Sequence, residues 1–336
     1  MPDIPIMRRL LALAALCLAP LPGLADCVGR DLVAELPATE REALRARADA
    51  VPFARGNLWR ASRDGEEVVL VGTYHLDDPR HGETMALLAA ELDKAATLLV
   101  EAGPEEEAAL KHRLAKEPEL MVQTTGPTLP ESLPPEQWQA LSEALQARGV
   151  PAFMGAKLKP WYLTLLLSVP VCALEAATQG SRGLDGMLIE AAASQGLPVR
   201  ALEPYDTVLR LFGDMTAAEQ IEMVTSTLAM EAQSEDMGAT LAAAYFAGES
   251  RLIWEFMQEQ SLQLPGQTPE TVAEEFARMD EAMIAGRNRG WIPLIEAEAA
   301  RGPVLVAFGA LHLSGEQGVL NLLAQRGFTV RPLDAP

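Results

Sequence analysis

The sequence predicts an α/β protein with a mostly parallel central sheet, flanking helices and a large helical insertion. An apolar run at residues 68–71 is followed by a helical pattern and by a second apolar run at 97–100, which is the order of a right-handed βαβ unit. A third apolar run at 304–308 resembles the first, because each is followed by G-x-x-H. We interpret the repeat as a pseudo-duplicated strand–GxxH unit and as the strongest sign of a functional site.

The N-terminal segment has the pattern of a secretory signal peptide. Two arginines at positions 8 and 9 precede an apolar stretch at 10–18, and Gly-Leu-Ala at 23–25 forms a small-residue cleavage site. We therefore expect residues 1–25 to be removed and residues 26–336 to form a single domain. The expected location is periplasmic or secreted.

Two cysteines remain after this cleavage, Cys27 and Cys172. A disulfide between them and a pair of free thiols are both open, because the sequence does not show their distance. Asp26 stands where a small residue precedes a lipidated cysteine, which argues against lipidation of Cys27 without excluding it.

A β-hairpin is expected before the first G-x-x-H. Residues 57–62 and 66–71 are separated by Arg-Asp-Gly, a turn signal, and the first of these strands is expected at the edge of the sheet. His75 follows the strand at 68–71 and Glu101 follows the strand at 97–100. Since parallel strands finish at the same edge of a sheet, we expect these two side chains to lie side by side at a ligand-binding rim.

The second half of the chain adds a helical region and a further strand. Residues 198–203 read as a strand that ends in Glu203, and apolar stripes at helical spacing from about 207 to 285 predict a helical insertion or lid. Residues 286–291 are expected to connect this region to a helix that ends near Ala300. The apolar stretches around Pro170 are too short to span a bilayer, so no stable membrane insertion is expected.

The charge of the chain limits the kinds of molecule that it is expected to bind. The formal net charge is −20 and no basic cluster occurs after the signal segment, which argues against nucleic acid. A peptide or small-molecule substrate is expected instead, and the sequence leaves the oligomeric state open.

The two G-x-x-H histidines, His75 and His312, suit two kinds of chemistry together with Glu101. They can hold a divalent ion (Mn, Co or Zn) with positions open for water. Alternatively, His75 is a general base on water and Glu101 orients it, without metal. Arg287 and Asn288 suit stabilising an oxyanion or gripping a substrate carboxylate. His81 is expected at the surface, at the start of a helix.

Short motifs in a fixed order resemble the TraB/GumN family, which includes TraB, PrgY, GumN and the animal TIKI proteins. They cover residues 58 to 315: Leu58-Trp59, Val71-Gly72-Thr73-Tyr74-His75-Leu76, Leu99-Val100-Glu101, Gly183-Leu184-Asp185, Leu202-Glu203, Arg287-Asn288 and Phe308-Gly309-Ala310-Leu311-His312-Leu313-x-Gly315.

The resemblance implies a fold like that of erythromycin esterases and ChaN-type proteins. It also implies metal-dependent peptidase activity of the TIKI kind, in which the catalytic and metal-binding residues map to His75, Glu101 and His312. Arg287 and Asn288 match the motif before the last G-x-x-H strand. The candidate substrate-binding residues are Tyr74, Asp185 and Glu203.

Three functions remain in competition. The first is a metal-dependent hydrolase, expected to be a peptidase, and the second is a metal-independent esterase-type hydrolase that uses His75 and Glu101. The third is a protein that binds a pheromone or haem at the same rim without turnover, although no C-x-x-C-H motif occurs. Family resemblance does not transfer a substrate, so the sequence leaves the three open.

Overall fold

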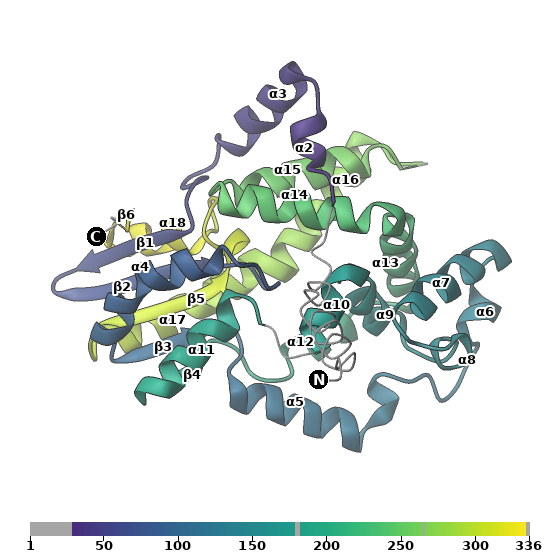
Figure 1. Ribbon diagram of the computed structural model, residues 1–336, viewed down its shortest axis with the longest axis horizontal. Helices are drawn as coiled ribbons and strands as arrows, with labels where there is room; N and C mark the ends of the chain where they lie inside the picture. Colours follow the sequence, from purple (N-terminus) through teal and green to yellow (C-terminus); the bar gives the residue numbers. More distant parts are fainter. Residues whose placement is uncertain (1–28, 179–181, 265, 334–336) are drawn as a thin grey trace, which may run out of the picture.

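A computed structural model describes residues 29–178, 182–264 and 266–333. A sheet with helices on both faces forms one part of the molecule, and a group of helices lies beside it (Figure 1). This is the expected α/β class.

The expected signal peptide and Cys27 lie outside the described residues, so both stay predictions. Cys172 is a disulfide cysteine.

The sheet has six strands in the order β4-β3-β5-β2-β1-β6. The four strands β4, β3, β5 and β2 are parallel neighbours. Their carboxyl ends therefore meet along one edge, which carries the candidate site. The strands are β1 (Leu58–Arg63), β2 (Glu66–Thr73), β3 (Thr97–Val100), β4 (Val199–Ala201), β5 (Val304–Gly309) and β6 (Thr329–Pro332).

The expected hairpin is confirmed, but its place in the sheet differs from the expectation. Strands β1 and β2 pair antiparallel around a turn in which Asp64 and Gly65 have φ values of 48° and 89°, the combination that a tight two-residue hairpin favours. However, β1 is not an edge strand, because β6 pairs with its other side. The pairing depends on residues far apart in the chain, and the local pattern contains no sign of it.

Strands β2 and β3 are parallel, as expected, but they are not neighbours. Strand β5 lies between them and pairs with both, for example Val71 with Ala307 and Val100 with Ala307. His75 and Glu101 are therefore separated by the strand that carries the second G-x-x-H. The two copies of the repeat occupy adjacent strands.

Two helix pairs cover the sheet and account for its continuous apolar strands. Helices α4 (His81–Lys94) and α11 (Leu184–Gln195) pack on one face, where Leu88, Leu188 and Leu305 share a buried cluster. Helices α17 (Gly286–Ala299) and α18 (Val319–Gln325) pack on the other. Because both faces are buried, alternate side chains of each strand enter different layers of core.

The segment from Gly286 to Trp291 is helical, contrary to the expected connection. It forms the first turns of α17. Trp291, Ile292 and Ile295 are buried against the sheet, and this packing outweighs the low helix propensity of two glycines. A π-helical turn, η4 (Glu281–Ala285), leads directly into α17.

The remaining helices lie between β3 and β4, between β4 and β5, and before β1. The helices α6, α7, α9 and α13 share one apolar core, and α2, α3 and α15 share another. None of the helices in the described ranges is long and apolar enough to cross a membrane. They are α2 (Leu32–Glu35), α3 (Ala38–Ala48), α5 (Pro104–Lys116), α6 (Leu129–Ser132), α7 (Pro135–Ala147), α8 (Ala152–Gly155), α9 (Pro160–Leu167), α10 (Val171–Thr178), α12 (Thr207–Gly213), α13 (Ala217–Ala229), α14 (Ser234–Phe246), α15 (Ser250–Ser261) and α16 (Pro269–Asp280), with 3-10 turns η2 (Pro118–Leu120), η3 (Glu231–Gln233) and η5 (Ala310–His312).

Candidate functional site

The side chains of both G-x-x-H histidines and of Glu101 converge above Gly309, at the end of β5. A Cβ atom placed on Gly309 would lie 3.2 Å from His75 Nε2, 3.4 Å from Glu101 Oε1 and 3.8 Å from His312 Cδ2. A side chain at this position would crowd the space that these groups face, and glycine keeps that space open. Three strands thus bring together residues that are distant in the sequence.

Gly72, in the first copy of the motif, has a different reason to be glycine. Its Cβ would lie 2.5 Å from Leu313 Cδ1 and 2.9 Å from Ala310 Cα. It allows the turn η5, which carries His312, to pack against the end of β2. The two glycines of the repeat therefore serve the same site in different ways.

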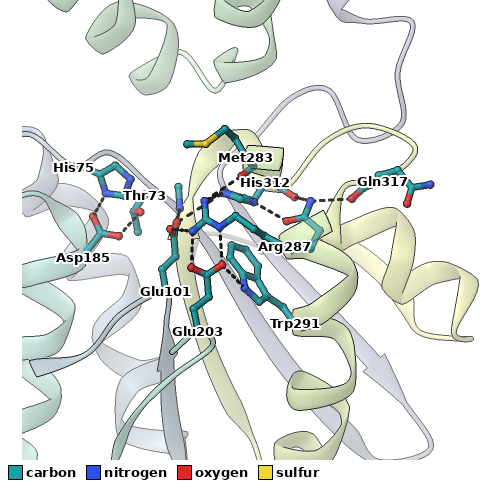
Figure 2. A network of polar contacts seen from close by, with 12 residues as sticks. Thr73, His75, Glu101, Asp185, Glu203, Met283, Arg287, Trp291, His312 and Gln317 are labelled. Atoms are coloured by element: carbon teal, nitrogen blue, oxygen red, sulfur yellow. Dashed lines mark hydrogen bonds and ion pairs between the residues drawn. The ribbon is translucent and has the colours of Figure 1, made fainter. Parts of the chain in front are cut away.

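Asp185, at the start of α11, orients His75. His75 Nδ1 donates to Asp185 Oδ2 at 2.8 Å, and Thr73 Oγ1 donates to the other carboxylate oxygen at 2.5 Å (Figure 2). The hydrogen bond to Asp185 raises the pKa of His75 to about 9. The His75 side chain is 64% exposed. Its Nε2 faces the site, 3.2 Å from the position that a Cβ atom on Gly309 would occupy.

Asn288 fixes the orientation of His312. The Asn288 Nδ2 donates to two backbone carbonyls, those of His312 and Gln317, so its Oδ1 is the acceptor for His312 Nδ1 at 2.6 Å. His312 Nε2 then carries the lone pair. Burial lowers the pKa of His312 to about 3, so the ring is neutral at neutral pH.

Glu101 is held as a carboxylate. Burial alone would raise its pKa, but the positive charges of Arg287 and His75, together with the Gly309 N–H, hold the pKa of Glu101 well below its usual range. The Gly309 N–H donates to Oε1 at 2.7 Å and Arg287 Nη2 donates to Oε2 at 2.5 Å. The carboxylate is therefore charged, fixed at both oxygens and 21% exposed.

Arg287 lies at the centre of the polar network. Its Nε and Nη2 donate to Glu203 at 2.6 and 3.1 Å, its Nη1 donates to Met283 O at 3.0 Å and to His312 Nε2 at 3.3 Å, and its Nη2 also reaches Glu101. All five N–H groups are thus engaged. In this arrangement Arg287 binds a substrate group only by giving up one of these bonds.

Glu203, two residues beyond β4, holds Arg287 from behind. It accepts the two Arg287 bonds and also the indole N–H of Trp291 at 2.9 Å. Its carboxylate is 11% exposed. The structure places Asp185 and Glu203, both expected to bind substrate, against His75 and Arg287 respectively.

Tyr74 and His81 belong to an aromatic cluster next to the site. The Tyr74 ring stacks on the Tyr245 ring, with 5.4 Å between the ring centroids. The centroids of the His81 and Phe246 rings are 5.2 Å apart. His81 begins α4 as expected, but it is fully buried rather than at the surface. Its Nε2 bonds to the Leu76 carbonyl, which fixes the loop after His75.

The donor set suits a divalent metal, but its present arrangement does not. The Nδ1 atom of His75 bonds to Asp185, and the Nδ1 atom of His312 bonds to Asn288. In both rings Nε2 is the nitrogen that remains for an ion, as is usual for metal-binding histidines. Nevertheless the guanidinium of Arg287 already contacts both His312 Nε2 and Glu101 Oε2. Among the described residues, no group of three or more His, Cys, Asp or Glu side chains is placed to hold a metal ion.

The TraB/PrgY/gumN family model matches residues 57–332, which is most of the chain. The chain belongs to this family. A comparison with curated proteins gives no match. The region matched by the family model includes every strand of the sheet and every site residue described above.

For this TraB/PrgY/gumN protein, sequence reasoning missed Thr73 as a partner of Asp185 and Trp291 as a partner of Glu203. Trp291 lies four residues after Arg287 on the same helix, a spacing that places two side chains on one face. That spacing was a usable signal, once residues 286–291 are recognised as helical. Thr73 had no local signal beyond its place two residues before His75.

Proposed function

We propose that this protein is a hydrolase that acts in the periplasm or outside the cell and activates water between His75, Glu101 and His312. The observation that carries the proposal is the convergence of these side chains on the space above Gly309. Two imidazoles and a fixed carboxylate face one point at the carboxyl end of a parallel sheet, where α/β proteins bind ligands. A peptide is the proposed substrate.

A divalent ion (Mn, Co or Zn) is the proposed cofactor of this activity. His75 Nε2, Glu101 Oε1 and His312 Nε2 would hold it, and Asp185 and Asn288 fix the rings in the orientation that this requires. When bound, such an ion lowers the pKa of water and polarises a carbonyl. His312 is buried, so bulk water is excluded from its side of the site.

A metal-independent hydrolase is the second candidate, and the His75–Asp185 pair favours it. The carboxylate holds the imidazole by Nδ1, as in catalytic dyads that take a proton from water at Nε2. Glu101 would orient that water. The contact between Arg287 and His312 Nε2 is also consistent with this form, because it leaves no free lone pair on His312.

Metal content and turnover distinguish the two candidates. Protein purified without a histidine tag is analysed by mass spectrometry and tested on peptide and ester libraries, with and without chelator. We expect about one Mn, Co or Zn per chain, lost in the His75→Ala/His312→Ala variant, and cleavage that stops on chelation. Chelator-insensitive ester hydrolysis by metal-free protein would select the second candidate. A bound ligand without any turnover would contradict both.

The metal-independent form makes a prediction about pH. His75 can accept a proton only when its imidazole is neutral and Nε2 carries no hydrogen. Asp185 raises the pKa of His75 to about 9. In chelator-treated protein, kcat/KM is therefore expected to rise with pH and to level off above this value. Asp185→Asn removes the charged partner, so the pKa falls toward its ordinary value of 6.5 and the rise moves to lower pH. Identical pH–rate profiles for the two proteins would contradict the assignment of His75 as base.

A further inference from the structure

The segment that carries His75 extends beyond the sheet. The β2–β5 ladder ends at Thr73, two residues before His75, so contacts with other elements set the position of the ring. Asp185 bonds to the side chains of Thr73 and His75, and the backbone N–H of Leu184 donates to the Tyr74 carbonyl at 3.1 Å. These contacts come from the start of α11, which therefore anchors the segment.

A tyrosine from the helices between β4 and β5 provides a second anchor. Tyr245 lies near the end of α14 and is only 4% exposed, and its hydroxyl donates to the Gly72 carbonyl at 2.9 Å. Burial raises the pKa of Tyr245, so the hydroxyl keeps the proton that it donates. The Tyr245 ring stacks on the Tyr74 ring with 26° between the ring planes. One side chain thus contacts two of the three residues that precede His75.

Backbone contacts fix the position of Tyr245 itself. Asn57 Nδ2 donates to the Tyr245 carbonyl at 2.6 Å, and the N–H of Gly72 donates to the Asn57 carbonyl at 2.7 Å. Close by in the chain, the N–H of Gly56 donates to the Gly248 carbonyl at 2.8 Å. The end of α14 is therefore tied both to the residues just before β1 and to the end of β2.

We infer that Tyr245 is a positioning residue, which holds the end of β2 so that His75 Nε2 faces the same space as Glu101. The inference rests on the proposed hydrolysis and needs no assumption about a cofactor. Tyr245 acts through its contacts with Gly72 and Tyr74. A misplacement of about 1 Å far from the chemistry can reduce a rate by about 10²-fold, so a small shift of the His75 ring is enough to slow turnover.

The test is steady-state kinetics of Tyr245→Phe on a substrate from the peptide or ester libraries. The substitution removes the hydroxyl and keeps the ring that stacks on Tyr74. We expect kcat to fall by about 10- to 100-fold. KM is expected to stay unchanged, because the substitution disturbs the placement of His75 and not the binding of the ground-state substrate.

Tyr162→Phe is the matched control. Tyr162 is a tyrosine of α9, and its ring packs on Trp161. Loss of its hydroxyl is expected to leave both kcat and KM at the wild-type values. Circular dichroism at the assay temperature checks that each variant is folded. If Tyr245→Phe is poorly folded, Asn57→Ala tests the same anchor, because it removes the donor to the Tyr245 carbonyl, and kcat is again expected to fall at constant KM.

A double-mutant cycle with Asp185→Asn distinguishes positioning of His75 from a general structural effect. If Tyr245 and Asp185 both act by holding His75, the loss of kcat in the double variant is expected to be smaller than the product of the two single losses. Independent structural effects would multiply instead.

Three results would overturn the inference while leaving the proposed function in place. They are an unchanged kcat in the folded anchor variant, a loss that arises from a higher KM, and a double-variant loss equal to the product of the single losses. Lack of turnover by the wild type on every library substrate would overturn the inference together with the proposed hydrolase.

Discussion

Glu203→Leu is expected to lower the free energy of unfolding by about 3–5 kcal/mol, the cost of removing one partner from a buried ion pair. The Arg287 and Glu203 side chains are 15% and 11% exposed, so water replaces the lost carboxylate poorly. The substitution also removes the acceptor of the Trp291 indole N–H. Urea denaturation followed by circular dichroism measures the change.

The matched control is Glu281→Leu. Glu281 pairs with Arg289 at side-chain exposures of 62% and 46%, and exposed pairs of this kind contribute little. Its free energy of unfolding is expected to stay within about 0.5 kcal/mol of the wild type. If Glu203→Leu were equally harmless, the role given to Glu203 as the anchor of Arg287 would be wrong.

Glu101→Gln is expected to reduce kcat/KM by roughly 10²- to 10⁴-fold, the range typical of losing a positioned catalytic carboxylate. The amide keeps the size of the side chain and can still accept the Gly309 N–H. It cannot carry the negative charge that the site maintains by lowering the pKa of Glu101 to about 2. Steady-state kinetics on a substrate from the peptide or ester libraries measures the loss.

Glu107→Gln is the control for this substitution. Glu107 is 47% exposed on α5 and pairs only with Lys111 in the described part of the chain. Its kcat/KM is expected to equal that of the wild type. A comparable loss in both variants would show that the effect of Glu101→Gln comes from the change in the net charge of the protein and not from the loss of a carboxylate in the site.

Much of the site could be predicted from sequence because its parts have local patterns. Apolar runs identified β2, β3 and β5, and the residues just past their ends are His75, Glu101 and His312. Since parallel strands end at one edge, convergence followed without knowledge of the strand order. The duplicated G-x-x-H correctly marked two strands that prove to be adjacent.

The remaining features depend on contacts between distant segments. The insertion of β5 between β2 and β3 and the pairing of β6 with β1 are set by long-range register. The engagement of all five Arg287 donors could not be predicted either, because Glu203, Glu101 and His312 come from segments far from Arg287 in the sequence. Local periodicity carries no information on such pairings.

The most direct test of water activation is the product formed in H₂¹⁸O by wild-type protein and by Glu101→Gln. For the wild type, we expect mass spectrometry to find one ¹⁸O atom in the new carboxyl group of each product. Under the same conditions, Glu101→Gln is expected to yield almost no product. Unlabelled wild-type product, or labelled product that forms equally fast in Glu101→Gln, would contradict hydrolysis at the centre formed by His75, Glu101 and His312.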